Sequence, residues 1–415
     1  MENLSKILFI ANQFPPIGGS GVQRSLKFVK YLSRLGNEVL VVSKDASKDL
    51  KDDSLLNDVP ENVRVIRLKA HDINNSGLIK KVYAKFFALP DAEVFWYKFN
   101  KKEIEKIALE FNPDVIYTTS YPYSAHLFGL YLKEKFPKMK WIVDYRDEWT
   151  NNPFHLDSFS SRIKMKLSKK TELEINSKCD YFITNTRFML DNFVADLPEL
   201  KGKSTYIPNG YDEEDFLGIY PKEKSDKFTF IHTGALYGRR NLHEFLSALK
   251  ELIDEGKIDK SDIRINIAGN VKESQIEEYK KTYDLEKEIN YLSYLAHEES
   301  IRKLLEADVL LLLIGKGKGS ENFYTGKVFE YLRAYKNILA IVPKHGAAGE
   351  LIEETKTGVV AEPGETREIK NAIIKLYENY KSENNYYGDK ELIKKYSREA
   401  QAEELNNIIN KILEE

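Results

Sequence analysis

Residues 6–24 read KILFIANQFPPIGGSGVQR, an apolar stretch that leads through a glycine-rich turn into an amphipathic segment. The apolar stretch predicts a β-strand, and VQRSLKFVKYLSRLG predicts the helix after it. Gly18, Gly19 and Gly21 lie between them, where glycines let backbone N–H groups approach a phosphate at a helix N-terminus. The order is not G-x-G-x-x-G, because prolines stand where the first glycine would be. A tight turn without a ligand is the alternative interpretation.

The alternation of strand and helix continues along the whole chain. Apolar strand patterns and 3.6-residue helix patterns follow one another up to CDYFITNT, which predicts a parallel α/β domain. A connector rich in Pro and Gly follows, and the alternation restarts at FTFIHTG. We therefore expect two Rossmann-like, doubly wound domains that face each other across a cleft. The expected domains are residues 1–205 and 206–389, with a C-terminal helix over about 390–415 that packs back on the first domain.

Composition indicates a globular protein of a reducing compartment. The 415 residues include a single cysteine, Cys179, so a disulfide within the chain is excluded. The first apolar run is too short for a signal peptide, and ADVLLLLIG is about half a membrane span. We expect a cytoplasmic protein that does not cross a bilayer.

The net charge of −2 hides an asymmetry between the halves. Residues 1–205 hold 32 Lys and Arg against 26 Asp and Glu, a net +6, and the remainder holds 31 against 39, a net −8. The densest basic stretch is SSRIKMKLSKK, residues 160–170, whose Ile and Leu have helical spacing. It predicts a small amphipathic patch suited to an interface. The basic first half suits an anionic membrane or a phosphate-bearing acceptor, and ordinary solvated helices are the equal alternative. No motif for nucleic acid is present.

Three segments resemble one enzyme family. FPPIGGSGVQRSLKFVKYLSRLGNEVLVVS resembles the opening of the GT-B glycosyltransferases of family 4, IPNGYDEEDF resembles their interdomain segment, and GELIEETKTGVVAEPGE resembles their closing motif. The resemblance covers nearly the whole chain in order. It implies a nucleotide-sugar donor bound mainly by the second domain and a glycan or lipid-linked acceptor bound mainly by the first. It also implies a retaining transfer without a metal ion or other cofactor.

In the first domain the segment WIVDYRDEWTNNPF ends a strand with charged residues, which are costly to bury without partners. We expect Arg146 or Asp147 to contact the transferred sugar or the acceptor hydroxyl, a structural ion pair between them being the alternative. Many relatives carry His-Asp where this chain has Arg146-Asp147. His126, at a helix start, is a candidate sugar contact or a structural histidine. Arg24 can add a charged contact, and the turn at Gly18 and Gly19 is expected to close over the donor diphosphate.

In the second domain HTGALYGRRN resembles the donor-diphosphate loop of the family. Gly234 begins the turn, and Arg240 falls where the family has Lys. Arginine suits phosphate oxygens because its guanidinium donates in a fork. Ala235 replaces a second basic residue, for which Arg239 is expected to compensate. Further along the chain, GKGKGS at residues 315–320 lacks the P-loop order and predicts a flexible loop over the donor.

The segment ENFYTGKVFEYLRAYKN resembles the paired-glutamate motif of the family. Glu330 matches the second glutamate, which the family uses for the ribose hydroxyls, and Asn322 stands at the first. Thr325, Gly326 and Lys327 open the helix and are expected to hold the diphosphate. The sequence contains no Asp-x-Asp motif or His/Asp cluster that would predict a metal site.

Two other functions stay open. Sugar-nucleotide epimerases share the two-domain architecture and would convert a donor without an acceptor. A non-catalytic nucleotide-sugar binder is the third interpretation, because Ala235 and Asn322 depart from the family pattern. The sugar, the base and the acceptor cannot be read from fold analogy.

Overall fold

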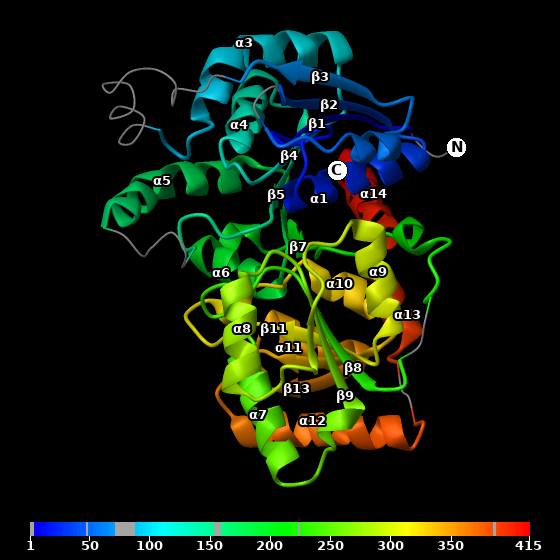
Figure 1. The fold of residues 1–415 in the computed structure, drawn as a ribbon. Coiled ribbons are helices and arrows are strands. Elements are labelled where there is room, and N and C mark those ends of the chain that lie inside the picture. The colour runs from blue at the N-terminus through cyan, green and yellow to red at the C-terminus, as the bar shows by residue number, and fades with distance from the viewer. Residues whose placement is uncertain (1–3, 47–48, 71–87, 153–158, 223–224, 385–386) are drawn as a thin grey trace. The chain divides into compact units, whose positions relative to one another are not determined.

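The computed structural model describes residues 4–46, 49–70, 88–152, 159–222, 225–384 and 387–415 (Figure 1). The chain divides into two compact units, one of Met1–Asn209 with Arg398–Glu415 and the other of Gly210–Ser397. The first crossing lies after Asn209 rather than after residue 205, because a short strand at Ser204–Tyr206 and the buried Ile207 still belong to the first unit. The stretch 390–397 stays with the second unit.

The first unit is built on a seven-stranded sheet in the order β3-β2-β1-β4-β5-β6-β7, in which every pairing is parallel. Residues Ile7 to Ile10 of the central strand β1 are fully buried. A parallel strand covered on both faces reads as a continuous apolar run, as KILFI does. The strands are β1 Lys6–Ile10, β2 Glu38–Lys44, β3 Arg64–Leu68, β4 Val115–Thr119, β5 Lys140–Tyr145, β6 Tyr181–Thr184 and β7 Ser204–Tyr206.

Helices cover both faces of this sheet. Ile7 and Phe9 pack toward α1 and α14, whereas Leu8 and Ile10 pack toward α3, α4, α5 and α6, because successive strand side chains point to opposite faces. Residues 398–415 therefore return to the first unit, where α14 supplies an apolar face to the core beside α1. The helices are α1 Ser20–Arg34, α3 Val94–Phe111, α4 Ala125–Lys135, α5 Phe159–Lys178, α6 Arg187–Asp196 and α14 Arg398–Glu414, with short 3₁₀ turns η1 Asp53–Asp58 and η3 Pro198–Leu200.

The second unit repeats the plan with six parallel strands in the order β10-β9-β8-β11-β12-β13. One face packs against α7, α8 and α12, and the other against α9, α10, α11 and α13. The strands are β8 Phe228–Thr233, β9 Ile263–Ala268, β10 Ile289–Tyr291, β11 Val309–Leu313, β12 Asn337–Ile341 and β13 Gly358–Ala361. The helices are α7 His243–Asp254, α8 Glu273–Thr282, α9 His297–Glu306, α10 Lys327–Arg333, α11 Ala347–Thr355, α12 Thr366–Lys381 and α13 Lys390–Lys394, with 3₁₀ turns η4 Glu213–Phe216, η5 Lys260–Asp262 and η6 Ser320–Asn322.

The expected fold class is confirmed: two parallel α/β sheets, each covered by helices on both faces. Two three-residue edge strands, β7 and β10, escape the sequence pattern because three residues show no periodicity. Among the described residues, no helix is long and apolar enough to span a membrane.

Candidate active site

Each unit has one point at which the strand order reverses. β1 pairs with β2 on one side and β4 on the other, and β8 pairs in the same way with β9 and β11. Loops that leave the carboxyl ends of such strands diverge and open a crevice where ligands bind. The loop after β1 carries Gly18 and Gly19, and the loops after β8 and β11 carry the expected donor residues.

Backbone hydrogen bonds hold the glycine-rich turn of the first unit at Gly18, and open space surrounds Gly19. Gly18 N–H donates to Leu50 O at 2.8 Å, and Asp52 N–H donates to Pro16 O at 2.8 Å. A Cβ on Gly18 would lie 3.1 Å from that of Asp52, whereas a Cβ on Gly19 would meet nothing within 4 Å. Gly19 is also the N-cap of α1 with φ 98°, and no side chain caps the helix there. Val22 N–H donates to Gly19 O at 3.3 Å, so the N–H groups that precede it at the start of this long helix are the ones left for an anion.

Arg146 ties this turn to the loop after β4. Its guanidinium donates to the backbone carbonyls of Gly21, Ser120 and Tyr121, the last at 3.1 Å. Burial lowers its pKa, which nearby Asp144 and Asp147 partly oppose. The geometry gives Arg146 a positioning role, because its donors face main-chain oxygens, while Asp147 beside it is exposed.

Arg24 is not available to a ligand, so the expectation that it adds a charged contact is wrong. Its Nε and Nη2 donate to the carboxylate of Asp144 at 2.9 and 2.8 Å, and Nη1 donates to Pro208 O at 3.0 Å. Burial by itself lowers the pKa of Arg24, but Asp144 outweighs it and the pKa is raised. Burial likewise opposes ionisation of Asp144, yet Arg24, with hydrogen bonds that include Thr119, brings its pKa below the usual value. This ion pair joins α1 to the carboxyl end of β5.

His126 lies in the core and does not reach a surface. Its side chain is fully buried, with Nδ1 2.9 Å from Thr118 Oγ1 and its ring 4.5 Å from that of Tyr145. Burial lowers its pKa to about 3, so the imidazole is neutral. Direct contact between His126 and a sugar does not fit this position, and the structural interpretation accounts for it.

In the second unit the turn after β8 depends on two glycines in close contact. Gly234 N–H donates to Ala268 O at 2.8 Å, and Gly234 has φ 134°. A Cβ on Gly269 would lie 2.2 Å from Gly234 O, so only glycine lets the two segments approach. Arg240 follows in this turn, its N–H donating to Tyr237 O at 3.0 Å and its guanidinium 5.4 Å from the Tyr237 ring.

Arg239 lies against the glycine loop that follows β11. A Cβ on Gly315 would lie 2.3 Å from Arg239 O, and one on Gly317 would lie 1.5 Å from its Nη1. The loop is closed on itself, since Gly317 N–H donates to Ser320 Oγ at 3.2 Å. GKGKGS thus forms a defined turn beside Arg239. A pocket here is lined by Arg239, Asn241, Glu244, Phe245, Leu313, Ile314, Gly315, Ile341 and Pro363.

The remaining donor candidates surround the start of α10. Lys327 Nζ lies 3.0 Å from Glu330 Oε2, and both side chains are partly exposed. Thr325 Oγ1 is buried and has no hydrogen-bond partner among the described residues, and Gly326 is the N-cap of α10. Asn322 ends the 3₁₀ turn η6 just before. A cation and a carboxylate in the first turn of α10 thus follow directly after an unsatisfied hydroxyl at the end of the preceding loop.

Sequence reasoning missed His232, the polar end of the apolar strand FTFIHTG. It is buried, and its Nδ1 lies 3.0 Å from Leu311 O. Burial, opposed by the hydrogen bond to Leu311 O and assisted by the charge of Arg240, lowers its pKa to about 4. A Cβ on Gly234 would lie 3.8 Å from Nε2, which has no hydrogen-bond partner among the residues described. A histidine directly before the glycine turn was the available signal.

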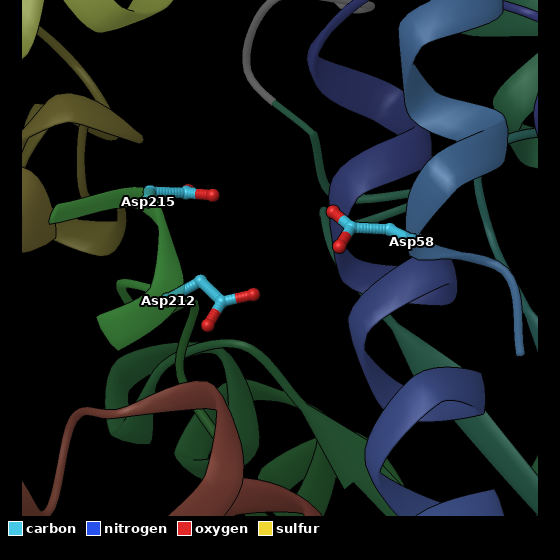
Figure 2. Close-up of side chains that lie close together, drawn as sticks. All are labelled: Asp58, Asp212 and Asp215. Atoms are coloured by element: carbon cyan, nitrogen blue, oxygen red, sulfur yellow. The ribbon is translucent and has the colours of Figure 1, made fainter. Parts of the chain in front are cut away.

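Three aspartates, Asp58, Asp212 and Asp215, are drawn in Figure 2. Each forms its contacts within its own unit. Asp58 ends η1 and accepts hydrogen bonds from Lys27 and Lys30 at 2.6 and 2.7 Å. Asp212 caps η4 by accepting from Glu214 N–H at 3.1 Å, and Asp215 lies 3.2 Å from Nε2 of His297. These contacts assign the three carboxylates structural roles.

Comparison with known proteins agrees with this geometry. The family described as glycosyltransferase family 4 matches residues 19–215, and the family described as glycosyl transferases group 1 matches residues 220–391. No curated protein matches the chain. Among similar solved structures is a glycosyltransferase from Rickettsia africae, with 14% sequence identity over 99% of each chain and a TM-score of 0.68. The lipopolysaccharide outer core galactosyltransferase WaaB has 12% identity over 98% of this chain and 99% of its own, with a TM-score of 0.62. A putative UDP-N-acetylglucosamine 2-epimerase from Listeria monocytogenes has 12% identity over 99% of this chain and 97% of its own, with a TM-score of 0.58.

The fold and the two family matches define a glycosyltransferase of the GT-B fold. The chain belongs to the family 4 (group 1) glycosyltransferases, whose two matched regions together cover residues 19–215 and 220–391. The family implies a nucleotide-sugar donor and a glycan acceptor.

Proposed function

We propose that the enzyme transfers a sugar from a nucleoside diphosphate sugar to a hydroxyl acceptor with retention of configuration and without a metal ion. One observation carries the proposal: the loops after β8 and β11 bring Arg239 beside the glycine turn at Gly315 and Gly317, next to Arg240. A negative diphosphate is the leaving group that such cations suit.

The donor is held by the second unit. Arg239, Arg240 and Lys327 bind the diphosphate, and Glu330 accepts hydrogen bonds from the ribose hydroxyls. In the free enzyme Lys327 and Glu330 neutralise each other at 3.0 Å. On binding, the ammonium turns to phosphate and the carboxylate to ribose, so both charges keep partners.

Bond breaking places negative charge on the leaving diphosphate. Fixed cations and main-chain N–H groups stabilise that charge without reorganising, which is electrostatic preorganisation. The acceptor oxygen attacks from the face that the diphosphate leaves, and its proton passes to a donor phosphate oxygen. No protein nucleophile is required. Asp147 orients the acceptor, and Arg146 holds the glycine turn and the loop after β4 in place.

The cellular setting is a further part of the proposal. We place the enzyme in the cytoplasm, in peripheral contact with the inner face of the cell membrane, in the synthesis of cell-surface polysaccharide or glycolipid. The single buried Cys179 suits a reducing compartment, and WaaB, which is similar in fold, is a lipopolysaccharide galactosyltransferase. We expect no nucleic acid partner.

The test begins with a panel of nucleotide sugars and thermal unfolding, since the true donor stabilises the folded state. With that donor, Arg240→Ala/Lys327→Ala should lower turnover by orders of magnitude. Arg264→Ala/Lys287→Ala, which removes two exposed cations of the same unit, should not. Near-full turnover in the first variant would sink the phosphate assignment. Conversion of the donor without any acceptor would instead indicate an epimerase, and tight donor binding without turnover would indicate a binding protein.

A further inference from the structure

Helix α5 presents a mixed apolar and basic stripe to solvent. Ile163, Lys166, Leu167 and Lys170 are exposed, and their spacing of three and four residues aligns them on one face of the helix. Ile163 is 46% exposed and Leu167 is 57% exposed. These four residues are called the α5 stripe below. Large aliphatic side chains that cluster on a solvent-exposed face are stabilised when a partner covers them, so such a cluster indicates an interaction surface.

The opposite side of α5 is firmly attached to the first unit. Met165 and Ile175 are buried in the core that the helix shares with α4 and α6. Lys169 forms ion pairs with Glu172 at 2.8 Å and with Asp196 at 2.6 Å. Figure 1 shows the N-terminal part of α5 extending away from the body of the first unit. The stripe is therefore held outward on a rigid element.

The two lysines of the α5 stripe lack an acidic partner among the described residues. Residues 161–170 hold five Lys and Arg and no acidic residue. Lys166 and Lys170 form no ion pair in the part of the chain that the structure describes. The contrast is α3, where Phe99 is also exposed but Lys102 and Lys106 pair with glutamates. Leu109 is exposed on α3 as well. What distinguishes α5 is that its exposed aliphatic residues lie in a stretch, residues 161–170, that holds no acidic residue.

We propose that the α5 stripe docks on an anionic lipid bilayer surface, with Ile163 and Leu167 in the headgroup region and Lys166 and Lys170 against lipid phosphates. Charge complementarity selects this occupant, since residues 1–205 carry a net +6 and the stripe lies within their densest basic stretch, residues 160–170. An amphipathic helix of this kind lies in the plane of the interface. The inference rests on the proposed peripheral membrane contact and names the surface that makes it.

The test is sedimentation of the full chain with vesicles, without donor or acceptor, so that failure of the transfer reaction does not affect it. Wild type should bind phosphatidylcholine vesicles that contain phosphatidylglycerol and should not bind phosphatidylcholine alone. Each lysine near an anionic surface raises partitioning about fivefold. Lys166→Glu/Lys170→Glu should therefore reduce binding by at least about 25-fold, and Ile163→Ser/Leu167→Ser should reduce binding as well. Turnover of a water-soluble acceptor should stay at the wild-type level in both.

The matched control is Lys101→Glu/Lys106→Glu on α3, which makes the same charge change on another exposed helix. An equal loss of binding in this control would reduce the effect to overall charge and overturn the assignment to α5. Binding of the α5 variants at the wild-type level, or equal wild-type binding to neutral vesicles, would overturn it too. Light scattering tests the alternative that the stripe contacts a second copy of the chain. A wild-type dimer that Ile163→Ser/Leu167→Ser dissociates would assign the stripe to that contact instead of to a membrane.

Discussion

Arg24 and Asp144 form a two-pronged ion pair in the interior of the first unit, with Nε–Oδ2 at 2.9 Å and Nη2–Oδ1 at 2.8 Å and neither side chain more than 2% exposed. The pair joins α1, which follows the glycine turn, to the end of β5. The third arm of Arg24 donates to Pro208 O, just before the chain crosses to the second unit. One side chain thus fixes three segments that meet at the candidate site.

Removing one partner of this pair should be costly. Asp144→Ala leaves a buried guanidinium without its anion, which typically costs about 3–5 kcal/mol. Arg24→Met/Asp144→Leu, which removes both charges, should be more stable than either single variant, although Pro208 O then loses a donor. Urea unfolding measures all three. Single variants within about 1 kcal/mol of wild type would show that the pair is not closed to water.

Gly269→Ala should impair the donor site from outside it. The new Cβ would lie 2.2 Å from Gly234 O and 2.6 Å from Gly234 C, so the backbone of the turn must move. A displacement of about 1 Å in a catalytic loop can cost about 100-fold in turnover. Gly256→Ala is the control for a positive φ, because at its φ of 67° the left-handed backbone costs about 1–2 kcal/mol with no atom within 4 Å. Gly269 itself has φ 139°. Equal turnover in both variants would contradict the close approach.

The fold could be predicted because its signals are long and repeated. Strands such as KILFI and VLLLL are buried on both faces, and the helices between them have clear 3.6-residue patterns. β7 and β10 could not be predicted, since a three-residue edge strand is defined by its neighbour rather than by its own residues. The first crossing point was misplaced by four residues for the same reason, because β7 lies in the connector.

The sequence could predict which loops carry the candidate site, but not which side chains pair with one another there. The turns at Gly18 and Gly234 follow β1 and β8, where parallel sheets open. Which cation faces a ligand depends on contacts distant in sequence. Arg24 pairs with a carboxylate 120 residues away, whereas Arg239 and Arg240 stay at the surface of their turn. No local pattern separates these arginines.

Leu405→Ala on α14 should destabilise the first unit selectively. Leu405 is fully buried among the apolar residues of α1 and β1, and such a truncation typically costs about 2–5 kcal/mol. Leu376→Ala on α12 makes the same change in the core of the second unit. Hydrogen exchange should rise in α1 for the first variant and in α7 for the second. The reverse assignment, or equal rises in both helices, would show that α14 does not belong energetically to the first unit.

Stability should fall as the pH drops below about 6.5, because two histidines are buried in neutral form. The folded pKa of His126 is about 3 and that of His232 is about 4, against 6.5 in the unfolded chain. The unfolded state therefore binds more protons between pH 6.5 and 4, so each histidine removes about 1.4 kcal/mol of stability per pH unit in that window. The lowered pKa of Asp144 makes stability fall in a separate, more acidic pH range, as the pH drops below the ordinary value of 3.8. His126→Asn/His232→Asn should flatten the decline in urea unfolding between pH 6.5 and 4, and His345→Asn, at an exposed position, should not. A double variant with the wild-type slope would mean that neither histidine is held neutral.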